Sequence, residues 1–147
     1  MKTHESRSEL ETRTIARSFG ELLRKGDVVA LFGELGSGKT QFVKGVCEAF
    51  GVRSPVASPT FVIQSRYEGI SSDKQPMILY HFDLYRIEKL EEIFDLGYEE
   101  FLFGDGICLI EWADRLGDLL PERRYDVSLT LGEEGDSRRI VIEKVGT

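Results

Sequence analysis

A glycine-rich segment at residues 33–40, Gly-Glu-Leu-Gly-Ser-Gly-Lys-Thr, has the residue types and the spacing of a phosphate-binding loop. Three glycines let the backbone turn and bring its N–H groups close to an anion: Gly33, Gly36 and Gly38. Lys39 is placed to reach the β- and γ-phosphates, and the Thr40 hydroxyl is a ligand for Mg²⁺. The segment predicts a site for ATP and Mg²⁺.

Two acidic residues are the candidates to support hydrolysis at this loop. Phosphoryl transfer needs a metal ion, a positioned water and stabilisation of charge, so a loop that only binds phosphate is insufficient. Glu111 closes an apolar run, at the carboxyl end of an expected strand, where it would ligate Mg²⁺ directly or through water; the alternative is a solvated strand end. Asp83 is the second acid, and its alternative role is an ion pair with Arg86.

Three further features could act near the phosphates. His81 lies on the same strand face as Asp83 and Tyr85, and it is either a proton carrier or, more commonly, a structural donor. Trp112 would stack on an adenine or belong to the core. Thr60, in the Pro-containing loop 54–60, offers a hydroxyl where phosphate-loop enzymes sense the γ-phosphate.

The expected elements place the loop between a buried strand and a helix. Val28–Phe32 is a continuous apolar run, typical of a strand buried on both faces. Other expected elements are helices at 8–24, 40–50 and 89–103 (interrupted near Gly97), a short helix or turn at 114–120, a strand at 107–112, and hairpins from 61–67 with 77–84 and 127–131 with 139–145. Their order predicts one α/β domain over residues 1–147. We expect a three-layer sandwich like that of the P-loop NTPases, with a mixed, mainly parallel central sheet and antiparallel hairpins.

The composition limits the classes of protein that remain. The chain has 147 residues and a net charge of -7, whereas a protein that grips nucleic acid alone is usually basic; partners would therefore hold most of any RNA. No apolar run approaches the roughly 20 residues that span a bilayer, and residues 1–13 lack a secretory pattern, so we expect a cytoplasmic protein without membrane contact. Cys47 and Cys108 have no zinc spacing and are expected to be buried thiols.

Four motifs together resemble one family, the bacterial TsaE (YjeE) family of small ATPases. They are Gly-Glu-Leu-Gly-Ser-Gly-Lys-Thr, Ser-Pro-Thr-Phe at 58–61, His-Phe-Asp-Leu-Tyr-Arg at 81–86 and Ile-Glu-Trp at 110–112, in that order. The resemblance covers about residues 12–145. The resemblance implies that this protein acts with TsaB and TsaD. Together they would make N6-threonylcarbamoyladenosine at position 37 of tRNAs that read codons beginning with A. ATP hydrolysis would regulate or reset that complex, and tRNA would be met only through it.

The resemblance also implies roles for individual residues. Lys39, Asp83 and Thr60 would be catalytic, with Asp83 the essential acid and Thr60 the switch residue, while Thr40 and Glu111 would ligate Mg²⁺. The nucleotide would contact Thr12, Gly33, Glu34, Leu35, Gly36, Ser37, Gly38, Lys39, Thr40, Gln41, Trp112 and Arg138. Thr14 is a rival for Thr12, and Arg139 for Arg138. Glu34 and Ser37 depart from the usual Asp and Ala of the family, which are mild changes.

Three other functions share the phosphate loop. A small-molecule kinase usually needs an acceptor lobe and an arginine-rich lid, and this short chain has scattered arginines. A GTPase would need Asn-Lys-x-Asp to select guanine, and the sequence has no such motif. A non-catalytic module, in which ATP only orders residues 58–61 for partner docking, is the remaining alternative.

Overall fold

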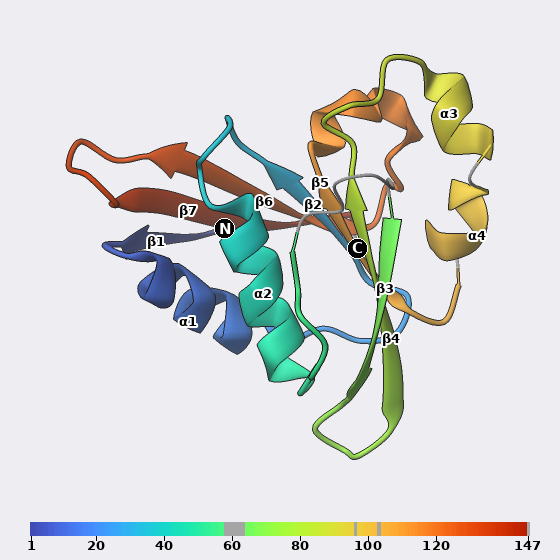
Figure 1. Cartoon of the computed structure of the whole chain (residues 1–147), viewed down its shortest axis with the longest axis horizontal. Helices are drawn as coiled ribbons and strands as arrows, with labels where there is room; N and C mark the ends of the chain where they lie inside the picture. Colours follow the sequence, from blue (N-terminus) through green and yellow to red (C-terminus); the bar gives the residue numbers. More distant parts are fainter. Residues whose placement is uncertain (58–63, 96, 103, 147) are drawn as a thin grey trace.

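A twisted seven-stranded sheet forms the centre of the protein, with helices on both of its faces (Figure 1). The computed structural model describes residues 1–57, 64–95, 97–102 and 104–146. Its strands are β1 (Lys2–Ser6), β2 (Val28–Phe32), β3 (Gln64–Ile70), β4 (Pro76–Asp83), β5 (Ile107–Glu111), β6 (Arg124–Leu131) and β7 (Arg138–Val145). Its helices are α1 (Glu9–Gly20), α2 (Lys39–Ala49), α3 (Leu90–Asp95) and α4 (Tyr98–Leu102), with 3₁₀ turns η1 (Ala113–Arg115) and η2 (Gly117–Leu119).

The strand order is β1-β7-β6-β2-β5-β4-β3, and the four middle strands are parallel. The antiparallel pairs β3–β4, β6–β7 and β7–β1 complete the two sides of the sheet. β2 and β5 are almost wholly buried, as their apolar sequences require for neighbouring central strands. This architecture confirms the expected α/β fold with a mixed sheet, mainly parallel at its centre, and antiparallel hairpins.

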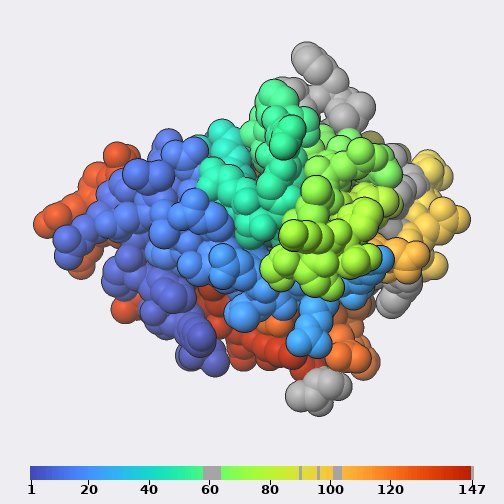
Figure 2. Space-filling model, turned by 90° about the horizontal axis from the view of Figure 1, so that it is seen from below, coloured from blue at the N-terminus to red at the C-terminus, as the bar shows by residue number. Residues whose placement is uncertain are grey.

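The two faces of the sheet carry separate apolar clusters. On one face, α1 and α2 cover a cluster that includes Phe19, Phe42 and Leu109. On the other, the segment from α3 to η2 covers a cluster around Ile93 and Ile110. In Figure 2 the blue α1 and the turquoise α2 lie side by side on one face, with the green β3–β4 hairpin next to α2. The sheet is thus the middle layer of three.

α1 and α2 pack closely because each carries a glycine at their contact. A Cβ on Gly20 would lie 2.9 Å from the Ala49 Cβ, and a Cβ on Gly45 would overlap the Arg13 carbonyl oxygen. The Ser8 side chain caps the start of α1 by accepting the Glu11 N–H at 3.1 Å. The close packing fixes the position of α2 against α1.

Several element boundaries differ from the sequence-based expectation. The strand β1 was not expected, because Lys2–Ser6 has no apolar alternation. The first helix ends at Gly20 rather than at residue 24. β4 ends at Asp83, so Tyr85 does not share a strand face with His81 as expected. The interruption near Gly97 is confirmed, since Gly97 has φ 67° between α3 and α4.

Some of the expected elements include residues that the structure does not describe. The beginning of the strand expected at 61–67 and the loop residues 58–60 lie outside the described residues; the strand is described from Gln64. Over the described ranges, no helix is both long and apolar enough to cross a membrane.

Candidate functional site

The glycine-rich loop joins the carboxyl end of β2 to the first turn of α2, as its sequence predicts. Gly38, the residue before α2, has φ 103°, a conformation that side chains rarely adopt. A Cβ on Gly33 would lie 2.6 Å from the Leu129 carbonyl oxygen and would overlap the Ser37 hydroxyl. The backbone is therefore free of side chains where it faces the N-terminus of α2, which favours an anion there.

The Lys39 side chain folds back into the loop. Its Nζ donates to the carbonyl oxygen of Gly33 at 2.6 Å and to that of Glu34 at 2.9 Å, and it lies 3.5 Å from the Ser37 Oγ. Lys39 is 5% exposed, so its ammonium is held at the centre of the loop rather than in solvent. The positive charge of Lys39 therefore lies against the backbone of the loop.

Burial lowers the pKa of Lys39 below its usual value, because the ammonium loses water. Four surrounding carboxylates act in the opposite direction and favour the charged form: Glu111, Asp83, Asp114 and Glu34. The site thus combines one buried cation with several acids around it.

Thr40 and Glu111 meet beneath the loop. The Thr40 Oγ1 donates to the Glu111 carboxylate, at 3.0 Å to Oε1 and 3.2 Å to Oε2. Thr40 comes from the first turn of α2, and Glu111 is the last residue of β5 and only 3% exposed. Because the parallel strand β2 leads into the loop beside β5, the structure brings together two residues that are 71 positions apart. A solvated strand end, the alternative for Glu111, is wrong.

Asp83 lies beside Glu111 in the sheet. The two residues are register partners at the ends of the parallel strands β4 and β5. The Asp83 Oδ1 accepts the backbone N–H of Tyr85 at 3.1 Å, which holds the carboxylate at the turn after β4. Asp83 is half-buried and is one of the acids that act on the Lys39 ammonium. The alternative role of Asp83, an ion pair with Arg86, stays a prediction.

Trp112 leaves the strand in a left-handed backbone conformation, with φ 58° and ψ 42°. The strand expected to include Trp112 therefore ends one residue earlier. The half-buried Trp112 ring lies under Lys39, whose Nζ is 4.0 Å from the centroid of the ring. The Tyr85 ring centroid is 4.9 Å from that of Trp112. A cation over an indole face is attracted by the ring's π electrons. Trp112 thus borders the loop rather than the core alone.

Thr12 is favoured over Thr14 as the threonine of α1 that reaches the loop. Thr12 is buried, its Oγ1 lies 2.7 Å from the Ser6 Oγ, and its methyl group is 3.9 Å from where a Gly38 Cβ would be. Thr14 is exposed, and its hydroxyl donates to the Leu10 carbonyl one turn earlier.

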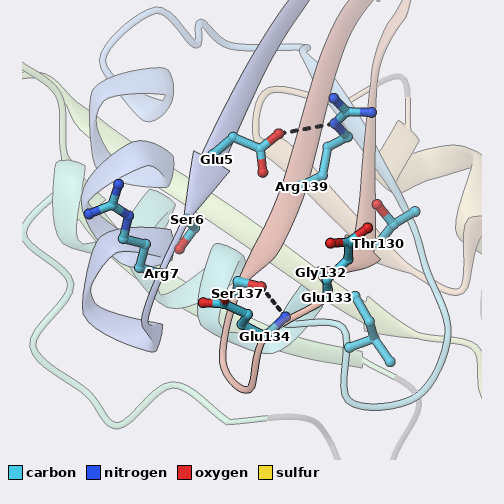
Figure 3. Close-up of a pocket in the computed structure, with 10 residues that line it drawn as sticks. Glu5, Ser6, Arg7, Thr130, Gly132, Glu133, Glu134, Ser137 and Arg139 are labelled. Atoms are coloured by element: carbon cyan, nitrogen blue, oxygen red, sulfur yellow. Dashed lines mark hydrogen bonds and ion pairs between the residues drawn. The ribbon is translucent and has the colours of Figure 1, made fainter.

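Arg138 and Arg139 point to opposite sides of the β6–β7 hairpin, since adjacent strand residues alternate between faces. The Arg138 Nη2 donates to the Gly36 carbonyl oxygen of the loop at 3.1 Å. Arg139 instead pairs with Glu5, at 3.1 Å, beside a hollow of about 630 Å³ between β1 and the hairpin (Figure 3). The preference for Arg138 at the loop agrees with this geometry.

Three other residues predicted to contact the nucleotide lie on the loop or just after it. Glu34 and Leu35 are exposed at its tip, and Gln41 is half-buried in the first turn of α2. Thr60 lies outside the described residues. Cys47 and Cys108 are buried free thiols, as predicted.

His81, expected to be a proton carrier or a structural donor, lies at the site: its Nε2 is 2.5 Å from the Glu111 Oε2. One further contributor has no signal in the sequence. Asp114, two residues after Trp112, acts on the Lys39 charge. Within the described ranges, no group of three or more His, Cys, Asp or Glu residues could hold a metal ion.

Comparisons with known proteins agree with one another. The family described as "Threonylcarbamoyl adenosine biosynthesis protein TsaE" matches residues 6–141. The tRNA threonylcarbamoyladenosine biosynthesis protein TsaE of Treponema pallidum is 40% identical over 89% of this chain and 93% of its own length. That of Bacillus subtilis is 39% identical over 92% of this chain and 81% of its own.

The solved structures agree as well. The crystal structure of YdiB from Bacillus subtilis aligns with a TM-score of 0.80 and 32% identity, over 99% of this chain and 86% of that one. The order of the four motifs, the P-loop fold and the family match over residues 6–141 lead to one conclusion. This chain belongs to the TsaE family of tRNA threonylcarbamoyladenosine biosynthesis proteins.

Proposed function

We propose that this protein binds and hydrolyses ATP with Mg²⁺. The observation that carries the proposal is the contact of the Thr40 hydroxyl with the Glu111 carboxylate, next to the buried Lys39 ammonium. These groups lie where the loop, the N-terminus of α2 and the carboxyl ends of the parallel strands converge. This is where nucleotides bind in open α/β sheets.

The donor set fits Mg²⁺. Thr40 and Glu111 offer a hydroxyl and a carboxylate oxygen, which are hard oxygen ligands. Bound there, Mg²⁺ would offset the negative charge of the phosphates and of the surrounding acids. Lys39 would leave the Gly33 and Glu34 carbonyls to hold the β- and γ-phosphates.

Other residues would complete the reaction. Asp83 would orient the attacking water or accept its proton, since it lies beside Glu111 in the sheet. Trp112 would flank the nucleotide, and Thr12 and Arg138 would steady the two sides of the loop. Thr60 would sense the γ-phosphate.

We further propose that ATP turnover serves threonylcarbamoylation of adenosine 37 in tRNAs that read codons beginning with A. The names of the relatives support this role. TsaB and TsaD would be the partners, with TsaD carrying the transfer chemistry and this protein resetting the complex. The net charge of -7 supports contact with tRNA through those partners rather than alone.

The ATPase is tested by phosphate release from purified variants. Lys39→Ala and Asp83→Ala should each lower the turnover rate about 100-fold or more. Asp83→Ala should still bind a non-hydrolysable ATP analogue, whereas Lys39→Ala should bind it weakly. Lys44→Ala, on the same helix but outside the loop, is the matched control. Wild-type turnover by Lys39→Ala or Asp83→Ala would refute the mechanism.

The role in tRNA modification is tested by reconstitution with TsaB, TsaD, tRNA and the small-molecule substrates. Repeated rounds of modification should need this protein and hydrolysable ATP. Equal support from the non-hydrolysable analogue would favour the non-catalytic module instead. Transfer of phosphate to an added nucleoside would favour the kinase. Undiminished modification without this protein would overturn the assignment.

A further inference from the structure

His81 is a fully buried polar residue whose Nε2 forms a hydrogen bond with Glu111. It is 0% exposed and lies on β4, two residues before Asp83 and on the same face of the sheet. Its Nε2 is 2.5 Å from the Glu111 Oε2 on the neighbouring strand β5. Tyr67, from β3, lies with its ring centroid 6.2 Å from that of His81. The imidazole therefore sits between an aromatic ring and a carboxylate, away from solvent.

The direction of this hydrogen bond follows from its surroundings. An ionised carboxylate only accepts hydrogen bonds, so the His81 Nε2 carries the hydrogen. The other ring nitrogen, Nδ1, has no hydrogen-bond partner among the described residues. Among the described residues, the ring is thus oriented by Glu111 alone.

Packing alone does not account for a histidine here. A buried polar atom without a partner costs free energy, and an aliphatic side chain would fill the same space without that cost. Leu79 does so two residues earlier on the same strand face. The polar ring at residue 81 therefore indicates that the Glu111 carboxylate requires a hydrogen-bond donor on this side.

The two Glu111 oxygens are held differently. His81 contacts Oε2, while Oε1 is the oxygen nearer to the Thr40 hydroxyl, at 3.0 Å against 3.2 Å. Release of the Thr40 hydroxyl towards a cation would leave the carboxylate still anchored through Oε2. Oε1 would then keep its place on the Thr40 side.

We propose that His81 is a positioning residue for Mg²⁺: its Nε2–H holds the Glu111 carboxylate so that one oxygen stays directed at the cation beside Thr40. The inference rests on the proposed function, since it assigns Mg²⁺ to Thr40 and Glu111. Groups that orient a metal ligand in this way typically change metal affinity about 10- to 100-fold when they are removed.

A pair of amide substitutions separates the role of Nε2 from that of a buried ring. The amide nitrogen of Gln occupies about the position of the imidazole Nε2, and that of Asn the position of Nδ1. His81→Gln therefore keeps the donor towards Glu111, whereas His81→Asn moves it to the Nδ1 side, where the described part of the chain offers no partner. His81→Leu, similar in volume and without a donor, is the second loss variant.

The experiment titrates Mn²⁺, as a paramagnetic substitute for Mg²⁺, into each folded variant with a non-hydrolysable ATP analogue, and measures free Mn²⁺ by electron paramagnetic resonance. His81→Asn and His81→Leu should bind Mn²⁺ about 10- to 100-fold more weakly than the wild type. His81→Gln should lie near the wild type. Binding of the analogue without metal should be the same in all four proteins, which excludes a general defect of the loop.

Two results would overturn the inference: a wild-type Mn²⁺ constant in the folded loss variants, or equal weakening in His81→Gln and the loss variants. The proposed ATPase fails by a different measurement, the absence of phosphate release from the wild type. Mn²⁺ binding without hydrolysis would leave the positioning role to be decided by the Gln and Asn variants.

Discussion

The ammonium of Lys39 lies 4.0 Å from the centroid of the Trp112 ring, so the phosphate-loop cation and an aromatic ring are in direct contact. Binding of a polyphosphate would draw the ammonium from the ring towards the new negative charge. The contact therefore links occupancy of the loop to the surroundings of the indole.

We predict that phosphate binding changes the fluorescence of this protein. Trp112 is its one tryptophan, so the emission reports a single site. Tripolyphosphate with Mg²⁺, which has no base to stack on the ring, should change the emission of the wild type. Lys39→Met should start from a different emission and should not respond. A response of Lys39→Met equal to that of the wild type would place the signal elsewhere.

The buried Lys39 should also make stability depend on pH. Its lowered pKa means that the folded protein gives up the ammonium proton at a lower pH than the unfolded chain does. Between these two pKa values the unfolded state binds more protons, so the free energy of unfolding gains a positive slope with pH. Below the lowered pKa, Lys39 is charged in both the folded and the unfolded state. The full cost of burying the charge then lowers the free energy of unfolding.

Urea unfolding over a series of pH values measures this effect. The free energy of unfolding of the wild type, minus that of Lys39→Met, should rise as the pH approaches the ordinary lysine pKa. The subtraction removes the other groups that titrate in this range. A difference that stays flat, or falls, over that range would contradict the burial of a charged ammonium.

Arg138 and Arg139 form a matched pair of neighbouring residues with opposite contacts. Arg138→Ala removes the hydrogen bond to the Gly36 carbonyl and should weaken ATP binding by about 1–2 kcal/mol, roughly 5- to 30-fold. Arg139→Ala removes only an exposed pair with Glu5 and should leave ATP affinity unchanged. Calorimetric titration with ATP analogue compares them, and equal effects would refute the assignment of Arg138.

The two cysteines should be inert in the folded protein. Burial raises the pKa of both the Cys47 and the Cys108 thiol to about 12, so neither forms thiolate at pH 8. Ellman's reagent should react with both only after unfolding in urea. Modification of the native protein at the rate of a free thiol would show that one of these side chains is accessible.

The phosphate loop could be predicted from the sequence because its signal is local. Eight consecutive residues carry it, and the strand before and the helix after it have clear apolar patterns. The proximity of Asp83 to Glu111 was also within reach, since both close strands that lead to the same edge of the sheet.

The remaining features depend on contacts between distant segments. β1 is held by pairing with β7, and its polar residues carry no pattern of their own. The side of the hairpin to which Arg138 points follows from the register of β7, which no single residue reveals. His81 and Glu111 are 30 positions apart, and their hydrogen bond appears only when β4 lies beside β5.

The left-handed backbone at Trp112 gives one position two conflicting requirements. Its φ of 58° suits glycine, whereas the contact with Lys39 requires an aromatic ring. Trp112→Gly should therefore be more stable than Trp112→Ala, the reverse of the usual order, because alanine keeps the backbone strain and loses the ring. The ring also packs against the cluster around Ile93 and Ile110, so both variants should be less stable than the wild type. Residue 112 thus keeps a strained backbone because its ring makes contacts that glycine cannot make.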